Sequence, residues 1–392
     1  MTLGKVDFER RPILAFWETT RACGLACMHC RASAIREPVP GELSTEEAEH
    51  LLQQLAEFGT PPPVLVATGG DVLMRADIDH LAALAQERRL PLALAPSVTP
   101  LLNADRIGAL RRLGLRVASI SLDGASAAVH DRVRGIEGHF EATLAAIRML
   151  RAQQIVVQVN TLVMRDTVCD LPQIARIVQE TGASIWEVFF LIQVGRGASQ
   201  QALDATENEQ VCHLLFDASH YGMVVRTVEA PFFRRVVAER MDGAEPTPGD
   251  LYHELHGRLV AELGTPQAAP RAQTKGTRDG SGIIFIAHDG TITPSGFLPL
   301  ELGNVREDNL SSVYRHHPLL RKIRSAHFAG RCGSCRYRHI CGGSRARAYA
   351  VTGDPLGEDP GCAYVPSRER PVTSRPAEPL RLDRAAEDAL GR

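Results

Sequence analysis

Short apolar runs rich in β-branched residues alternate with amphipathic stretches of helical spacing from residue 12 to about residue 228. This alternation is typical of βα units arranged around a parallel sheet. Six successive units predict an α/β fold with a partial (β/α)6 barrel of the TIM type, and in such barrels the chemistry lies at the carboxyl ends of the strands. The six expected strands cover residues 13–17, 64–68, 92–96, 117–121, 155–160 and 186–191.

Helix boundaries can be read between several of these runs. Ser44 followed by Glu47 forms a capping box, and Gly59 stands at the expected end of that helix. Asn103 and Gly114 bracket a second helix in the same way. The loops that follow the strands are therefore well delimited, and functional residues are expected in them.

The pattern changes after the sixth strand. A helix is expected over 208–220 and a strand over 223–228, whereas residues 263–282 lack periodicity and predict a linker or mobile loop. A hairpin over 283–286 and 291–293 opens a smaller α+β module. The expected division is a barrel over 1–228, a connecting helix and linker over 229–282, the small module over 283–365 and a disordered tail over 366–392.

Composition and charge exclude several classes of protein. The chain has 44 Lys and Arg against 46 Asp and Glu and no long basic block, so the attraction that nucleic-acid-binding proteins use is missing. No stretch approaches the ~20 consecutive apolar residues of a membrane helix, and the first residues are polar and charged rather than signal-like. These features predict a cytoplasmic protein that binds no nucleic acid and spans no membrane.

The cysteines carry the most information about chemistry. Nine cysteines in 392 residues are too sparse for a disulfide scaffold, and seven of the nine fall in two tight groups. In a reducing compartment, such grouping indicates metal binding or redox chemistry. The other two, Cys169 and Cys212, stand alone in helical contexts and are expected to be small buried apolar side chains.

The first group, Cys23, Cys27 and Cys30, follows directly on the first expected strand. Three thiolates on one short loop can hold three irons of a cubane cluster and leave the fourth iron without a protein ligand. A small molecule with an amine and a carboxylate could chelate that iron and receive an electron from the cluster. The spacing also suits zinc with His29 as a fourth ligand, although a structural zinc has little reason to lie at the catalytic end of a barrel strand.

This cysteine spacing after a first barrel strand resembles the radical S-adenosylmethionine (SAM) superfamily. After the second strand, Gly69-Gly70-Asp71-Val72 is similar to the segment with which that family receives the amino group of SAM, because glycines let backbone carbonyls approach a ligand closely. The family usually has Glu-Pro or Asp-Pro there, and Val72 departs from this. The departure is expected to soften the turn without abolishing SAM binding.

Later strand ends resemble the same family. Ser121-Leu122-Asp123-Gly124 followed by Arg134 is similar to the subgroup whose Ser, Asp and Arg hold the ribose and carboxylate of SAM. Asn160 and the stretch from Ile192 to Gly195-Arg196-Gly197 correspond to the strand ends that frame the adenine. The resemblance implies a SAM-binding [4Fe-4S] cluster on the catalytic residues Cys23, Cys27 and Cys30. The cofactor-binding residues that it implies are His29, Gly69, Gly70, Asp71, Ser121, Asp123, Arg134, Asn160 and Ile192.

The second group of cysteines has the pattern C-x2-C-x5-C-x20-C and consists of Cys332, Cys335, Cys341 and Cys362. Four thiolates complete either a zinc tetrahedron or a fully ligated iron–sulfur cubane, and spacing does not separate the two. Together with the preceding hairpin, the group resembles the auxiliary-cluster extension called SPASM. Ser295 and Arg345 stand where the full extension has further cysteines. The resemblance therefore implies one auxiliary [4Fe-4S] cluster, held by these four cysteines.

Five arginines lie near the second group in the sequence: Arg331, Arg336, Arg338, Arg345 and Arg347. They can balance the negative charge of a cluster and its thiolates, or bind carboxylates of a substrate. Each can equally be a solvated arginine paired with a surface acid.

The resemblance implies reductive cleavage of SAM to a 5′-deoxyadenosyl radical, which abstracts hydrogen from a substrate in a barrel that excludes water. A reductant such as flavodoxin or ferredoxin would supply the electron. The auxiliary pattern looks most like enzymes of haem and nitrite-reductase haem synthesis, which alter tetrapyrrole propionates, and an Arg-lined site suits such carboxylates. The alternative substrate is a ribosomally made peptide, and the alternative of another class is a non-catalytic metal-binding scaffold.

Overall fold

The computed structural model describes residues 7–246, 249–266, 268–272 and 276–366. The tail expected over 366–392 lies outside the described residues except for its first residue. The strands are β1 (Leu14–Glu18), β2 (Val64–Thr68), β3 (Leu92–Leu94), β4 (Val117–Ser121), β5 (Val156–Val163), β6 (Ile185–Phe190), β7 (Val224–Val228), β8 (Ile283–Ile286), β9 (Thr291–Thr293) and β10 (Gly303–Asn304).

Helices follow most of the strands. The helices of the first part are α1 (Thr45–Ala56), α2 (Ile78–Glu87), α3 (Ala104–Arg112), α4 (Ala127–Arg134), α5 (His139–Ala152), α6 (Leu171–Thr181) and α7 (Ala205–Ala218). The later ones are α8 (Phe233–Met241), α9 (Asp250–Leu263), α10 (Leu310–His316), α11 (Pro318–Arg324), α12 (Gly330–Ser334) and α13 (Arg345–Thr352). No helix in the described part of the chain is long and apolar enough to cross a membrane.

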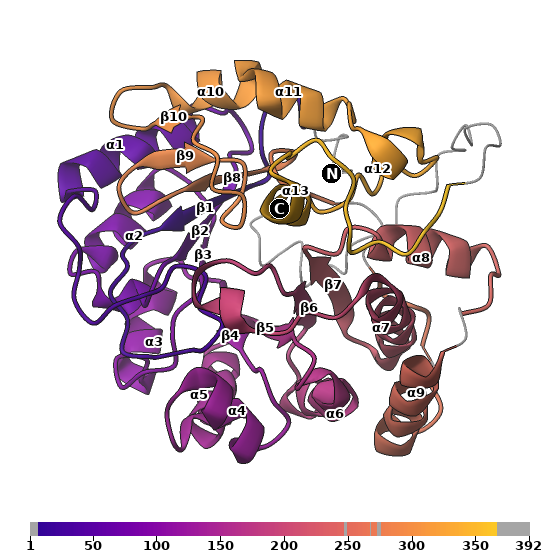
Figure 1. Ribbon diagram of the computed structural model, residues 1–392. Coiled ribbons are helices and arrows are strands. Elements are labelled where there is room, and N and C mark those ends of the chain that lie inside the picture. Colours follow the sequence, from indigo (N-terminus) through magenta and orange to yellow (C-terminus); the bar gives the residue numbers. More distant parts are fainter. Residues whose placement is uncertain (1–6, 247–248, 267, 273–275, 367–392) are drawn as a thin grey trace.

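The ten strands form one sheet in the order β10-β9-β8-β1-β2-β3-β4-β5-β6-β7. The strands from β8 through β1 to β7 are parallel to their neighbours, and only the pairs that involve β9 are antiparallel. The sheet curves, and α1 to α6 lie along its outer side (Figure 1). Its edge strands are β10 and β7, so it is an open barrel. The predicted α/β class and partial barrel are confirmed.

The hairpin of the small module belongs to the barrel's own sheet. β8 pairs in parallel with β1, with Leu14 opposite Ile283 and Trp17 opposite Ile286, and β9 returns antiparallel to β8. The sequence predicts this hairpin at the residues where it forms, but no local pattern indicates that it joins β1. The division of the chain into a barrel and a small module therefore stays a prediction.

The two faces of the sheet have different environments. Outward-pointing side chains such as Trp17, Trp186 and Val225 pack into the main hydrophobic core. The inner face is apolar at β1 to β4, where a separate cluster consists of Val64, Val66 and Ala93 with Leu14, Phe16 and Val117 against them. Because side chains alternate along a strand, residues next to outward-pointing ones face this lumen.

Most element ends follow from local chemistry, and some expected ends are wrong. The capping box of Ser44 and the cap by Asn103 form as predicted. The third strand stops at Leu94, since Pro96 has no N–H to continue the ladder. The fifth strand runs on to Val163, so Asn160 lies inside it. The helix expected from residue 208 begins at Ala205, because Asp204 forms a capping box of its own.

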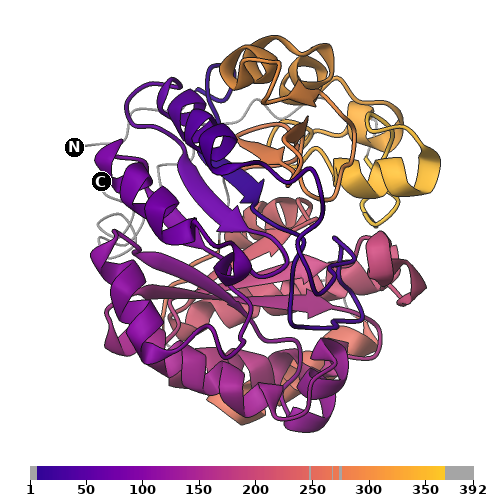
Figure 2. The ribbon, with the colours of Figure 1, turned by 90° about the vertical axis from the view of Figure 1, so that its left-hand side faces the viewer.

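The C-terminal helices lie on one side of the barrel. α10 and α11 follow the edge near α1, and α13 sits close to the middle of the view in Figure 1. Ala346 of α13 packs against Ile192 and Leu298, so this helix covers the loop after β6. Figure 2 shows the long indigo loop after β1 between the magenta helices and this orange and yellow part.

Candidate active site

The three cysteines of the first group lie together in the loop after β1. Cys23 and Cys27 are buried and pack with Leu25 and Ala34, and Cys30 lies against the same cluster. Burial raises the pKa of the Cys27 thiol, and the neighbouring thiols of Cys30 and Cys23 raise it further. Backbone N–H groups point at two of the sulfurs, from Leu25 to Cys23 Sγ at 3.4 Å and from Ala34 to Cys30 Sγ at 3.4 Å. The loop thus presents three converging sulfurs at the carboxyl end of a barrel strand.

A pair of glycines after β2 holds the start of this loop. Gly70 N donates to Thr20 O at 2.7 Å, and Asp71 N donates to Ala22 O at 2.6 Å. A Cβ on Gly69 would lie 2.6 Å from Thr20 O, and one on Gly70 would lie 2.2 Å from Ala22 O. Both positions therefore require glycine, because the two backbones touch immediately before the first cysteine.

Replacing Gly70 with alanine should lower about 100-fold the rate of the SAM cleavage that the resemblance implies, because a displacement of about 1 Å at a reacting group can cost that much. The new Cβ would push against backbone atoms of Ala22, next to Cys23. The rate of 5′-deoxyadenosine formation under dithionite measures the effect. Gly257→Ala is the matched control, since no atom lies within 4 Å of the added Cβ there. Equal rates in the two variants would contradict the role of the glycine clamp.

The Asp71 side chain is buried, and its carboxylate accepts hydrogen bonds from neighbouring loops. Its Oδ1 accepts hydrogen bonds from Leu73 N at 3.1 Å and Ser97 N at 3.3 Å, and its Oδ2 accepts one from Thr99 Oγ1 at 2.8 Å. Burial raises the pKa of Asp71. Ser97 Oγ in turn donates to Gly70 O at 3.0 Å and lies 3.4 Å from Cys23 Sγ. Sequence analysis missed Ser97, which joins the loops after β2 and β3 to the first cysteine.

The loop after β6 holds the same cysteine loop from another side. Arg196 Nε donates to Cys27 O at 2.8 Å and its Nη1 donates to Ala34 O at 2.9 Å. A Cβ on Gly195 would lie 2.2 Å from Arg31 O. The resemblance implies that this segment frames the adenine of SAM. In the structure, the Arg196 side chain instead donates hydrogen bonds to the cysteine loop. The side chain of Ile192, just before it, is buried against Leu298 and Ala346.

A buried polar cluster lies beside the second and third cysteines. Asp123 Oδ2 accepts from Arg134 Nη1 at 3.1 Å and lies 3.7 Å from His29 Nε2. Burial would raise the pKa of Asp123, but His29 and Arg134 outweigh it and lower the pKa. Burial also lowers the pKa of His29, which favours its neutral form. His29 Nδ1 and Arg134 Nε are buried without a hydrogen-bond partner among the described residues, so both atoms remain able to bind a polar ligand.

Two further predicted residues lie on adjacent strands. Ser121 at the end of β4 stands opposite Asn160 of β5 in the register of the sheet. Both side chains are partly exposed on the inner face. Asn160 Oδ1 accepts from Gln158 Nε2 at 2.8 Å. The structure therefore brings Ser121 and Asn160 to the carboxyl end of the lumen, on the side of the barrel where α4 and the cysteine loop meet.

The second group of cysteines surrounds one hollow. Cys332, Cys335, Cys341 and Cys362 all line a space with about 410 Å³ of empty volume, including the part open to solvent. Burial raises the pKa of Cys341 to about 12 and that of Cys362 to about 11. Without a bound metal these thiols are therefore neutral at physiological pH.

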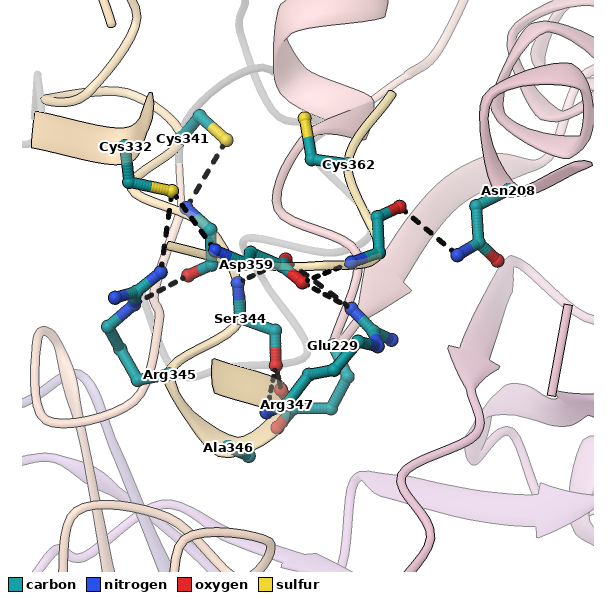
Figure 3. A network of polar contacts seen from close by, with 12 residues as sticks. Asn208, Glu229, Cys332, Cys341, Ser344, Arg345, Ala346, Arg347, Asp359 and Cys362 are labelled. Atoms are coloured by element: carbon teal, nitrogen blue, oxygen red, sulfur yellow. Dashed lines mark hydrogen bonds and ion pairs between the residues drawn. The ribbon is translucent and has the colours of Figure 1, made fainter. Parts of the chain in front are cut away.

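Hydrogen-bond donors point at the sulfurs of this group. Asp359 N donates to Cys332 Sγ at 3.4 Å, and Arg345 Nη2 donates to the same sulfur at 3.6 Å (Figure 3). Gly343 N donates to Cys341 Sγ at 3.4 Å. Behind them, Asp359 accepts from Ser344 N at 2.7 Å and from Arg347. The sulfurs thus lie in a prepared polar shell, of the kind that tunes iron–sulfur clusters.

The five arginines expected near this group divide into two kinds. Arg345 and Arg347 are buried and hydrogen-bonded within the shell. Arg331 pairs with Glu358, and the exposed Arg336 lies over the ring of Tyr337. The half-buried Arg338 accepts a hydrogen bond from Arg278 through its carbonyl.

Sequence analysis missed two arginines that approach from other elements, the buried Arg234 and the half-buried Arg278. Arg234 of α8 donates to Ile340 O at 3.2 Å, and Arg278 donates to His339 O at 3.1 Å. Burial and the nearby Arg234 lower the pKa of Arg278 to about 10, against the opposing effect of Cys341. Their positions depend on long-range packing, so no local signal could have assigned them to this site.

Glu18 connects the two halves of the site. Its Oε1 accepts from Arg31 Nη2 of the cysteine loop at 2.6 Å, and its Oε2 lies 2.9 Å from His288 Nδ1 in the β8–β9 turn. Burial would raise the pKa of Glu18, but the hydrogen bond from His288 and the charge of Arg31 lower it overall. This carboxylate ties the cysteine loop to the hairpin that precedes the second cysteine group.

Comparison with known proteins gives these features a context. The model of the Radical SAM superfamily matches residues 17–178. AdoMet-dependent heme synthase of Nitratidesulfovibrio vulgaris is 36% identical over 364 residues, covering 91% of this chain and 94% of the relative. Pre-heme d1 synthase of Dinoroseobacter shibae is 28% identical over 369 residues, covering 92% and 87%. The solved structure of Streptococcus suis SuiB bound to the precursor peptide SuiA has a TM-score of 0.68 at 15% identity, covering 91% of this chain and 76% of that one, which is a likeness of fold.

Proposed function

This chain belongs to the radical SAM superfamily, and from that premise we propose that it alters propionate side chains of a tetrapyrrole in haem synthesis. The observation that carries the proposal is the 36% identity to a heme synthase across 91% of the chain, far beyond the residues that the family model matches. A relative named for pre-heme d1 synthesis, similar over 92% of the chain, supports the same substrate class.

A radical SAM enzyme contains a [4Fe-4S] cluster and binds SAM. Bound together, they supply one-electron cleavage of SAM and a 5′-deoxyadenosyl radical that removes a hydrogen atom from the substrate. We assign the cluster to Cys23, Cys27 and Cys30, which converge in one buried group and carry donors to two sulfurs. A three-thiol set leaves one iron of a cubane for the amine and carboxylate of SAM.

The chain's own residues bind SAM and orient it. The backbone of Gly69 and Gly70 lies against the cysteine loop, where the amino group of SAM would be received. His29 Nδ1 and Arg134 Nε are buried without a hydrogen-bond partner among the described residues, and Arg134 Nε can only donate. Asp123 holds both side chains in place. We also assign Ser121, Asn160 and Ile192 to SAM contacts. Asp71 is assigned an indirect role, because its carboxylate binds Ser97 of the next loop.

The second group of cysteines is proposed to hold an auxiliary [4Fe-4S] cluster. Arg234 and Arg345 are buried close to it, Arg278 is half-buried beside them, and none forms a salt bridge with a carboxylate among the described residues. Burying cations with too little negative charge around them is costly, and with neutral thiols Arg234 and Arg278 share the nearby carboxylate of Asp279. Four thiolates around a cubane would add the further negative charge that balances these arginines.

Zinc remains the alternative for this group of cysteines. Four sulfurs around one zinc converge on a point about 2.3 Å from each of them. No three Cys, His, Asp or Glu side chains among the described residues are arranged to hold a single metal ion. Metal analysis of the anaerobically reconstituted protein separates the two, since zinc in place of iron would favour the non-catalytic scaffold.

The experiment is an anaerobic assay of the reconstituted protein with SAM and flavodoxin, ferredoxin or dithionite as the reductant. We expect 5′-deoxyadenosine and a mass change at propionate side chains when iron coproporphyrin III is present. The contrasting substrate is a ribosomally made precursor peptide, favoured by the fold that this chain shares with SuiB. Turnover of the peptide with an unchanged tetrapyrrole would contradict the proposal.

A further inference from the structure

Four polar side chains form a continuous row across the inner face of the sheet. In the register of the strands, Ser121 stands opposite Asn160, Asn160 opposite Glu187, and Glu187 opposite Arg226. On β6 the neighbours Trp186 and Val188 of Glu187 are buried in the outer core, and so is Val225 next to Arg226. Because side chains alternate along a strand, Glu187 and Arg226 both face the lumen.

The row begins at residues assigned to SAM and continues beyond them. Neighbouring strands lie about 4.8 Å apart, so the backbone of Arg226 is about 10 Å from that of Asn160. The row therefore extends two strands beyond the residues assigned to SAM. Glu187 and Arg226 have no part in the SAM assignment.

Arg226 is a cation of the lumen whose side chain interacts, among the described residues, only with the charge of Glu187. No hydrogen bond or ion pair joins its guanidinium to any described residue, and its Nε is buried and unsatisfied. Glu187 is held away by another contact, since its Oε2 accepts from Gln158 Nε2 at 2.7 Å. Burial raises the pKa of Glu187, and the charge of Arg226 opposes this effect. A guanidinium left unpaired in a lumen matches a planar anion, which it can bind with two parallel hydrogen bonds.

The rest of the lumen suits an apolar body that carries such an anion. The facing wall at β1 to β4 is the apolar cluster around Val64 and Val66. Phe189 on the inner side of β6 lies 6.4 Å, ring centre to ring centre, from Phe297 after the hairpin. An amphipathic molecule with a flat apolar face and a carboxylate at its edge would contact the apolar wall, the two phenylalanine rings and Arg226.

We propose that Arg226 binds a carboxylate of the substrate, while Gln158 holds the Glu187 carboxylate away from its guanidinium. The inference rests on the proposed function, because the carboxylate is identified as a propionate of the tetrapyrrole. It goes further in naming the wall of the barrel that selects the substrate. Arg226 is thereby a specificity-determining residue, distinct from those assigned to SAM, and Glu187 is its negatively charged neighbour.

The test measures binding by the reconstituted holoenzyme, with iron coproporphyrin III and its tetramethyl ester titrated anaerobically in the same detergent. Arg226→Gln should weaken binding of the tetra-acid by at least about 30-fold, as expected for a lost buried charge pair, and should leave binding of the ester unchanged. Glu187→Gln should retain or tighten binding of the tetra-acid, because it removes a negative neighbour. Arg148→Gln, on the exposed face of α5, is the matched control and should change neither.

Iron content and circular dichroism of each variant report folding. Tetra-acid binding by Arg226→Gln that equals the wild type would overturn the inference, while turnover of the tetrapyrrole by the wild type would still uphold the proposed function. Equal weakening by Arg226→Gln and Glu187→Gln would also overturn it, because the pair would then act only in maintaining structure. If the wild-type protein binds neither porphyrin, the proposed function itself fails.

Discussion

The Cys27→Ala variant is expected to form no 5′-deoxyadenosine from SAM under dithionite. Two thiols can bind only two irons, so the site that leaves one iron open for SAM is lost. Cys27 lies in the buried cluster with Cys23, and its carbonyl also anchors Arg196. Alanine keeps that backbone contact, so the loop should stay in place while its metal is lost. Liquid chromatography of the quenched reaction measures the nucleoside.

Cys169→Ala is the matched control for this variant. Cys169 was expected to be buried, but the structure places it at the surface, so that prediction is wrong. Cys169 lies just before α6, outside the helix whose apolar face is buried. Of the two lone cysteines, only Cys212 lies in the hydrophobic core. Cys169→Ala should cleave SAM at the wild-type rate. Retained cleavage in Cys27→Ala would overturn the assignment of the cluster.

The sequence predicts the elements of this protein better than their long-range contacts. The alternation of apolar runs predicts all six barrel strands, because the pattern that indicates each strand lies within a few adjacent residues. The hairpin over β8 and β9 was also predicted from neighbouring residues. Its pairing with β1 was not, because the register joins Leu14 to Ile283 and leaves no trace in either segment alone.

In the candidate site, too, local features could be predicted from the sequence and contacts between loops could not. Cysteine spacing and the glycine pair were evident in the sequence, since each lies within one loop. The roles of Arg196 and Glu18 became visible only with contacts between loops after β1, β6 and β8. Arg226 was missed for a further reason, because a single arginine in an apolar strand gives no sign of which face it occupies until the register is known.

Loss of the auxiliary cluster is expected to expose an electrostatic cost in the small module. In Cys341→Ala, iron should fall from about eight to about four atoms per chain. The midpoint of thermal unfolding should fall by at least about 5 °C, because breaking a buried charge pair costs about 3–5 kcal/mol. Arg234, Arg345 and the half-buried Arg278 would then lose the negative charge of the cluster and its thiolates. Iron analysis and a thermal scan measure the two effects, and eight irons in Cys341→Ala would contradict the ligand set.

Arg278→Met separates this electrostatic cost from simple loss of packing. In the wild-type background, the substitution removes a cation that faces the thiolates, so the unfolding midpoint should fall. In the Cys341→Ala background it removes a half-buried cation that has lost the charge of the cluster. The midpoint should then rise relative to Cys341→Ala alone, as it often does when apolar side chains replace enclosed charges. Arg148→Met, on the exposed side of α5, should shift the midpoint in neither background. A similar fall for Arg278→Met in both backgrounds would show that this arginine does not respond to the charge of a cluster.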